Sequence, residues 1–231
     1  MQQKGWQQAA ALMKKWFSRP ASVKPNYSQP PDLDTVKMEW LLKTSSVARN
    51  VYDNLVRDKI WANRPAQQAI AAQLRRKGVL LRGGRFGNLD LSVDKLHPDH
   101  INHRPVDYPN FSSDPDGVFA AFHDFAFYVT VGGEVAPIEN TSAWRVSITE
   151  IGVYAMDSFD FEGVQPLGWW DDSNDSFSVH PFHPDPSSSF ELITNRSFRN
   201  WRSEKKKGGD FLVFSDLKFI SLAVPNTFEI Q

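Results

Sequence analysis

Cysteine is absent from the 231-residue chain, which excludes disulfides, thiolate metal ligands and thiol catalysis. No apolar run reaches the roughly 18 residues that a membrane-spanning helix needs, so no such helix is predicted. The start, MQQKGWQQAAALMKKWF, lacks the basic beginning, apolar middle and small-residue cleavage site of a secretory signal. We therefore expect synthesis in the cytoplasm without a signal peptide, and any action elsewhere would require delivery by another route.

The net charge of only −1 conceals an uneven distribution. Residues 1–105 contain 18 Lys and Arg against 8 Asp and Glu, whereas residues 106–231 contain 8 against 19. The halves thus carry net charges of +10 and −11. Two interpretations stay open: the basic half contacts an anionic surface or partner, or the two halves complement each other.

Helical spacing characterises the beginning of the chain. Apolar residues over 6–17 fall on one helical face, and the proline-rich stretch ASVKPNYSQPPDLDT predicts an extended linker. A second helix is expected from about Thr35, with Asp34 as its N-cap. A third is expected over 65–78, with proline in its first turn and glycine at its end.

Strand-like alternation replaces helical spacing further along. The runs FHDFAFYVTVGG and WRVSITEIGVYAMD alternate apolar and polar residues, and FELITN and DFLVFSDLKFISLAV are also rich in strand-forming residues. KKKGGD, at 205–210, is interpreted as a hairpin tip. The sequence predicts an α+β fold, with a helical, basic N-terminal region over 1–105 and a β-rich, mainly antiparallel, acidic domain over 106–231.

Histidines and arginines supply several candidate ligands. His97, His100 and His103 recur every third residue, which fits either a zinc site or, the favoured reading because prolines interrupt the stretch, a solvated loop. His180 and His183 lie between prolines and are candidates to face an acidic site. Arg196, Arg199 and Arg202 are also three apart, so on a helix they would either bind phosphate together or form a solvated face.

The stretch DSFDF carries the strongest chemical signal. Asp157 and Asp160 flank Phe159 where the strand pattern fades, and further acids follow them. Two carboxylates so placed are suited to hold Mg²⁺, or to pair a base with a tuning acid. The alternative is an Asx-turn, because aspartate initiates turns well and Gly163 follows.

The runs HDFAFYVTVGGEV, ITEIGVYAMDSFDFEGVQPLGWW, NRSFRNWR and GGDFLVFSD resemble an uncharacterised bacterial domain family associated with interbacterial, type VI-like secretion. The DSFDF core is in turn similar to the Asp-x-Tyr-Asp-Phe motif of colicin M-like toxins. Those Mg²⁺-dependent enzymes cut lipid II, the undecaprenyl-linked cell-wall precursor, between the lipid and the pyrophosphate.

This resemblance implies a set of roles for residues of this chain. Asp157 and Asp160 would be the catalytic acids and metal ligands, and Phe159 would occupy the tyrosine position and contact substrate. The His-Arg that follows the motif in colicin M-like proteins is replaced here by EGVQPLG. The resemblance therefore leaves the cationic role to the histidines and arginines further along, with His183 and Arg199 as catalytic candidates and Arg196 and Arg202 as substrate-binding candidates.

The functional expectation is an antibacterial effector delivered to the periplasm of a target cell, where it hydrolyses a lipid-linked pyrophosphate with Mg²⁺. Its expected partners are a secretion-machinery component, a cognate immunity protein and a lipid-linked substrate at the membrane surface; no nucleic acid is expected. The alternative is a non-enzymatic adaptor or loading protein that binds an effector. The enzyme requires Asp157 and Asp160 to converge with a basic group in a cleft, whereas an adaptor leaves them exposed in a turn.

Overall fold

The computed structural model describes residues 1, 5–23, 29–108, 116–171, 176–178 and 190–231. Its helices are α1 Gln7–Ser18, α2 Met38–Thr44, α3 Ser46–Arg57, α4 Arg64–Arg76, η2 Val79–Leu81, α5 Val93–Leu96, η3 His97–Asp99, α6 Gly117–Phe122 and α7 Asn195–Lys205. Its strands are β1 Asp32–Val36, β2 Gly84–Phe86, β3 Asn102–Val106, β4 Phe125–Pro137, β5 Trp144–Phe159, β6 Pro166–Asp171, β7 Ser176–Ser178, β8 Glu191–Thr194, β9 Phe211–Ser215 and β10 Lys218–Ile230.

One long mixed sheet forms the backbone of the molecule. Its main path runs β1-β9-β5-β4-β2, with β10 paired to β5 and β3 paired to β4. Only the β1–β9 pair is parallel among these; the others are antiparallel. The 16-residue β5 spans the molecule because its first part pairs with β10 and its last four residues pair with β9. The predicted α+β class, with a mainly antiparallel β-rich C-terminal region, is confirmed.

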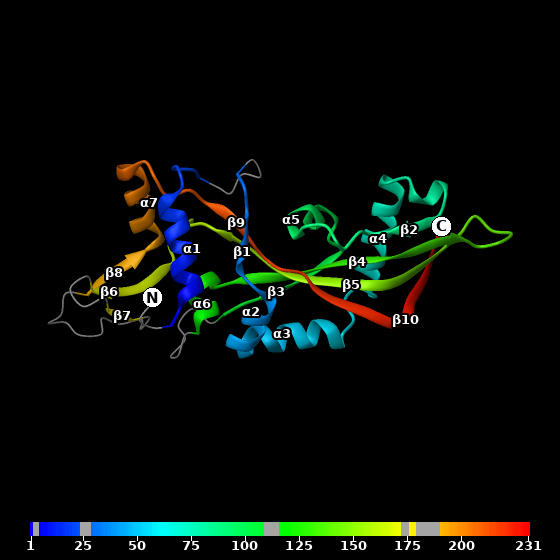
Figure 1. Cartoon of the computed structure of the whole chain (residues 1–231), viewed down its shortest axis with the longest axis horizontal. Coiled ribbons are helices and arrows are strands. Elements are labelled where there is room, and N and C mark those ends of the chain that lie inside the picture. Colours follow the sequence, from blue (N-terminus) through cyan, green and yellow to red (C-terminus); the bar gives the residue numbers. More distant parts are fainter. Residues whose placement is uncertain (2–4, 24–28, 109–115, 172–175, 179–189) are drawn as a thin grey trace.

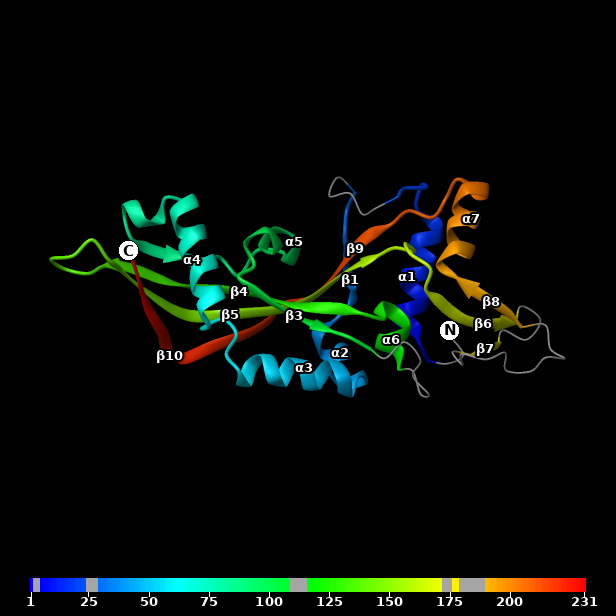
Figure 2. The ribbon, with the colours of Figure 1, turned by 180° about the vertical axis from the view of Figure 1, so that it is seen from behind.

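The two ends of the sheet carry different elements (Figure 1). At one end lie α1, α6, α7 and a small antiparallel sheet in the order β7-β6-β8. At the other end lie α4, β2 and the tip of the β4–β5 hairpin, as the reverse view also shows (Figure 2). The molecule is therefore elongated, and its ends are available for separate tasks.

Two helix predictions succeed, one from the spacing of apolar residues and one from the residues at the helix ends. Helix α1 has the predicted apolar face, with Ala9, Leu12 and Trp16 buried. Helix α4 begins after Asn63, whose side chain accepts the N–H of Ala66, and ends before Gly78 in a left-handed conformation. Both predictions are confirmed.

Two local predictions are wrong. The expected helix from Thr35 instead begins with β1, and Asp34 caps nothing; the following helical segment is split into α2 and α3 at Ser45. The expected hairpin tip at 205–210 is the end of α7 and its connection to β9. In both places contacts between distant parts of the sequence decide the conformation: β1 pairs with β9, and Lys207 and Gly209 form bridges with Pro20 and Ser22.

The main sheet and the core join the two halves of the chain. The boundary predicted between residues 105 and 106 falls inside β3, and β1 and β2 from the N-terminal half are strands of the same sheet. A single large core cluster contains residues from Trp6 to Ile230. The charge asymmetry therefore does not coincide with a break in the sheet or in the core.

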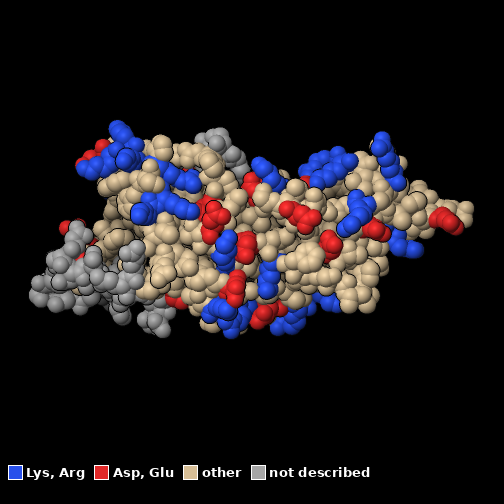
Figure 3. Space-filling view, in the orientation of Figure 1, with Lys and Arg blue, Asp and Glu red and all other residues tan. Residues whose placement is uncertain are grey.

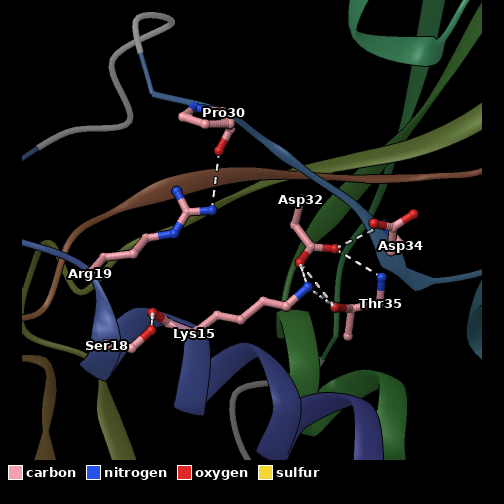
Figure 4. A network of polar contacts seen from close by, with 7 residues as sticks. All are labelled: Lys15, Ser18, Arg19, Pro30, Asp32, Asp34 and Thr35. Carbon is pink, nitrogen blue, oxygen red and sulfur yellow. Dashed lines mark hydrogen bonds and ion pairs between the residues drawn. The ribbon is translucent and has the colours of Figure 1, made fainter.

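Polar contacts fasten α1 to β1 beside the sheet (Figure 4). Asp32 is buried and pairs with Lys15, while its Oδ1 accepts the backbone N–H of Thr35 at 2.9 Å. Burial alone would raise the pKa of Asp32, but the hydrogen bonds from Lys15 and Thr35 and the charge of Lys15 outweigh it and lower that pKa. Arg19 donates to the carbonyl oxygen of Pro30 at 3.1 Å and holds the next turn.

Trp16 locks α1, α7 and β9 together. Its Nε1 donates to Oδ1 of Asp210 at 2.9 Å, and its ring meets that of Phe161 at a centroid distance of 4.8 Å. Gly208, at φ +93°, lies so close that an added Cβ would be 2.4 Å from the indole ring. Only glycine fits that position, because both the conformation and the space exclude a side chain. This junction fixes the wall behind the DSFDF motif.

Candidate functional site

Asp157 lies on the core-facing side of β5. The strand continues through the motif to Phe159, further than the sequence pattern indicates, so Asp157 pairs with Val213 of β9 and Asp160 is the first residue after the strand. Side chains alternate between the faces of a strand, which puts Asp157 on the same face as Ala155 and Phe159, both members of the main core. A carboxyl group is thus set in an apolar surface.

This position changes the acidity of the group. Burial raises the pKa of Asp157 well above its ordinary value, and the nearby carboxylates of Asp160 and Asp124 raise it further. The backbone N–H of Ser158 opposes the shift without cancelling it. Carboxylates crowded together without a counter-charge resist ionisation, so this site favours either a proton or a cation.

A cleft of about 490 Å³ opens over Asp157. Asp160 lines the same cleft, so the structure brings the two predicted acids to one cavity together with Phe159. Apolar residues from α1, α6, β6 and the chain after β5 form most of its wall: Trp6, Met13, Phe119, Phe122, Phe161, Leu167 and Trp170. The cleft is therefore acidic at one place and apolar around it.

A histidine–aspartate pair missed by the sequence reasoning also lines this cleft. His123 and Asp124 connect α6 to β4, and Nδ1 of His123 lies 3.1 Å from Oδ2 of Asp124. The other oxygen of Asp124 accepts the backbone N–H of Tyr108 at 2.8 Å, which fixes the carboxylate. The signal was present in FHDF: Ala126 pairs with Met156, so residues just before β4 lie beside the end of β5.

The backbone of His123 is strained. Its φ of +61° and ψ of −91° lie in a region that side-chain-bearing residues rarely adopt. Such a conformation costs about 1–3 kcal/mol and clusters at functional sites. The strain turns the chain sharply between α6 and β4 and sets the imidazole into the cleft.

Asp160 has a structural as well as a chemical setting. Its Oδ2 accepts the hydroxyl of Ser158 at 2.7 Å, and its Oδ1 accepts the backbone N–H of Glu162 at 3.1 Å. The second contact is the Asx-turn that the sequence offered as the alternative. Each oxygen keeps further lone pairs, so the turn and a cation are compatible uses of this carboxylate.

The three arginines of α7 do not form a phosphate-binding group. Arg199 donates to the carbonyl oxygens of Phe161 and Gly163, the latter at 2.7 Å, and so holds the turn after the motif. Arg202 is buried in an ion pair with Asp210 and lies over the Trp16 ring at 5.2 Å. Arg196 is exposed. None of the three is among the residues lining the cleft, which argues against the predicted substrate-binding roles of Arg196 and Arg202 and assigns Arg199 to positioning.

The histidines of HPDHINH pack against the opposite face of the sheet. His97 is buried, with Nδ1 2.9 Å from the hydroxyl of Tyr154, and its ring stacks on that of His100 at 5.1 Å. Burial, and then the neighbouring His100, lowers the pKa of His97 to about 4. The favoured solvated-loop reading is wrong for His97, which is part of a buried aromatic cluster.

Candidate metal ligands are not grouped in the described part of the chain. No group of three or more His, Asp or Glu placed to hold a metal ion occurs there, which leaves the zinc reading of His97, His100 and His103 without support. Asp157 and Asp160 would supply only two ligands, so a Mg²⁺ ion there would need oxygens from substrate and water. His180 and His183 lie outside the described residues.

The comparisons with known proteins give a family and no activity. A family of unknown function, DUF6402, matches residues 1–230. The chain belongs to this family. No curated protein and no solved structure matches the chain. Within the described segments, no helix of this DUF6402 protein has the length and apolar character required to cross a bilayer.

Proposed function

We propose that this DUF6402 protein is a hydrolase of lipid-linked pyrophosphates and that the cleft over Asp157 is its active site. The observation that supports this most directly is the grouping of the half-buried Asp157 carboxyl with two further carboxylates and a strained histidine around one cavity, a setting that raises the pKa of Asp157. Strongly perturbed titratable groups gathered in a cleft are characteristic of catalytic sites.

The composition of the cleft favours an amphiphilic substrate. Its wall carries the rings of Trp6, Phe119 and Phe122, among other apolar side chains, while its polar part combines four carboxyl groups with His123 and neutral polar side chains. An apolar wall accommodates the hydrocarbon nearest the headgroup, and polar groups fix the reacting end. A lipid-linked pyrophosphate has its hydrocarbon chain directly attached to its charged headgroup, so it presents an apolar and a polar part next to each other.

The charge of the cleft calls for a cation beside an anionic headgroup. Asp124, Asp157, Asp160 and Glu162 line it, and its described lining residues include no Lys or Arg. A pyrophosphate entering alone would be repelled. Mg²⁺, which is commonly held by one or two carboxylates plus substrate oxygens, would neutralise the phosphate charge there, with Asp157 and Asp160 as its protein ligands.

His123 is suited to act as the general base. A carboxylate on one ring nitrogen orients an imidazole and leaves the other nitrogen to take a proton from water. Asp124 occupies that position at Nδ1. Water would add to phosphorus as its proton passes to His123, the bond between phosphorus and the lipid oxygen would break, and the departing lipid alcohol would take up a proton from solvent.

The place of action is proposed from the sequence resemblance. An effector of this kind would be delivered into the periplasm of a target cell by secretion machinery, and the producing cell would hold an immunity protein. Lipid-linked cell-wall precursors such as lipid II are the corresponding substrates.

A non-enzymatic adaptor is the second candidate, and the motif itself favours it. Asp160 closes a turn and Arg199 bonds the carbonyls of that turn, so part of the motif has a purely structural use. In this case the apolar wall of the cleft would receive a segment of an effector, and the acidity of Asp157 would be incidental.

Periplasmic expression separates the two candidates. Bacteria would produce the chain behind an added signal peptide, beside the Asp157→Asn variant and a cytoplasmic version. If the protein hydrolyses wall precursors, cells should lyse only when they produce the wild-type protein in the periplasm. Unimpaired growth with all three, each soluble and folded, would contradict the hydrolase and leave the adaptor.

A further inference from the structure

A basic surface lies at the end of the molecule remote from the cleft. Residues 59–89 contain seven Lys and Arg and no Asp or Glu. Five of the seven gather where α4 ends and the chain turns through η2 into β2: Arg75, Arg76, Lys77, Arg82 and Arg85. Figure 3 shows Lys and Arg side chains gathered over this end of the molecule, where Figure 1 places α4 and β2.

Neighbouring acids neutralise this surface only in part. Asp99 accepts both Arg76, at 2.5 Å, and Lys77, and Glu150 lies 3.7 Å from Arg85. Arg82 is exposed and makes no ion pair with any residue in the described ranges. Glu134 stands opposite Arg85 in the β2–β4 pair, and Arg75 donates to the carbonyl oxygen of Gln231. Three carboxylates (Asp99, Glu134 and Glu150) against five cations leave a net charge of +2 on the surface.

An apolar side chain projects from the middle of these cations. Leu81 is 84% exposed, directly before Arg82, and Val79 and Leu80 beside it are only half-buried. The turn that presents Leu81 is rigidly closed, because Arg82 and Gly83 both donate to the carbonyl oxygen of Val79, at 3.2 and 2.9 Å. A leucine held in water by a fixed turn gains by entering an apolar phase.

We infer that this surface docks the protein on an anionic lipid bilayer, with Leu81 entering the boundary between headgroups and acyl chains. The charge is complementary to anionic headgroups, which attract nearby Lys and Arg electrostatically. A ring of cations around a protruding apolar group is the arrangement of peripheral membrane anchors, in which apolar burial adds to charge attraction. Docking on a bilayer does not need a groove that reads base edges or stacks bases. Binding of a nucleic acid would also give the exposed Leu81 side chain no apolar environment to enter.

The inference does not rest on the proposed hydrolysis. The docking surface and the cleft lie at opposite ends of the elongated molecule (Figure 1), so variants at one end leave the other intact. Docking would hold the molecule at a membrane whatever the cleft does there.

Vesicle sedimentation tests the inference with the full chain. Binding would be measured on phosphatidylcholine vesicles with and without phosphatidylglycerol, for wild type, Arg82→Ala/Arg85→Ala and Leu81→Ser. We expect binding only with the anionic lipid, a loss of roughly twentyfold in the double arginine variant and about fivefold in Leu81→Ser. Controls are Lys205→Ala/Lys206→Ala at the other end and Val224→Ser, whose side chain is 80% exposed on β10; both should bind as wild type.

Three outcomes would overturn it. The first is no binding of the wild type to anionic vesicles at low salt. The second is equal loss in the Lys205/Lys206 control, which would mean nonspecific charge attraction. The third is unchanged binding in Leu81→Ser together with full displacement by a short RNA, which would identify a site for polyanions instead of a bilayer.

Discussion

Nδ1 of His123 lies 3.1 Å from Oδ2 of Asp124, and this pair opens onto the cleft that contains the half-buried carboxyl of Asp157. The imidazole is held there by a backbone conformation that only glycine adopts without strain. Backbone strain at the junction of α6 and β4 thus accompanies the placement of a base beside a group of acids. This pattern is expected of a catalytic centre.

Asp157→Asn should make the protein more stable and inactive at once. Because the pKa of Asp157 is raised in the folded state, its carboxyl ionises less readily there than in the unfolded chain. The free energy of unfolding therefore falls as pH rises through and above the ordinary pKa of an aspartate. Asparagine removes that cost. Chemical denaturation at several pH values should show a stability gain that grows with pH, while activity falls by at least a hundredfold.

Mg²⁺ should stabilise the wild type but not Asp157→Asn. A ligand that binds only the folded state raises the melting temperature, and a carboxyl with a raised pKa must release its proton to bind a metal. The effect of Mg²⁺ should therefore strengthen as pH rises. Asp124→Asn, which keeps both proposed ligands, is the matched control; a Mg²⁺ effect that survives in Asp157→Asn would remove that residue from the metal site.

His123→Gly and His123→Ala should separate strain from chemistry. Both remove the imidazole and should reduce activity at least a hundredfold, but only glycine relieves the positive φ. His123→Gly should thus be more stable than His123→Ala by about 1 kcal/mol or more. Equal stability of the two variants would show that the conformation of His123 carries no strain.

Arg202→Ala should destabilise the fold without a specific effect on substrate binding. Removing it leaves the buried carboxylate of Asp210 without the positive charge that neutralises it, which costs about 3–5 kcal/mol. Arg196→Ala, on the exposed side of α7, is the control and should change unfolding by less than about 0.5 kcal/mol. A raised KM in a stably folded Arg202 variant would contradict the structural role.

His97 should make the fold sensitive to mild acid. Its folded pKa of about 4 lies below the ordinary value of 6.5, so the unfolded chain binds a proton more readily between these values. Stability present above pH 6.5 is therefore lost as pH falls toward 4, by roughly 3 kcal/mol in total. His97→Gln should flatten this part of the pH–stability curve, whereas exposed His103→Gln should leave it unchanged.

The predictable parts of the fold are those fixed by neighbours in sequence. Periodicity identifies α1, the residues at its two ends identify α4, and alternation identifies β4 and β5. The sequence predicts a linker and the start of a helix over residues 32–36, because their parallel pairing with β9, some 180 residues away, has no local signal. Trp16 and Asp210 are 194 positions apart in the sequence, and Asp210, which accepts from Trp16, is also the partner that buries Arg202.

The candidate site was half predictable for the same reason. Asp157 and Asp160 stand in one short motif, so composition alone singles them out. His123 and Asp124 become relevant only when the register of β4 on β5 is known, because that pairing brings residues more than thirty positions apart to one edge. Arg199 donates hydrogen bonds to the turn after the motif, and not to a phosphate, because α7 packs behind the motif. The spacing of residues in the sequence does not predict this packing.

The most direct test is cleavage of purified lipid II in detergent by the wild type, with and without Mg²⁺, beside folded Asp157→Asn. The proposed function predicts Mg²⁺-dependent release of the pyrophosphate-bearing headgroup by the wild type and its loss in the variant. Absence of cleavage by a wild type whose melting temperature responds to Mg²⁺, or equal cleavage by both proteins, would contradict the proposed catalysis.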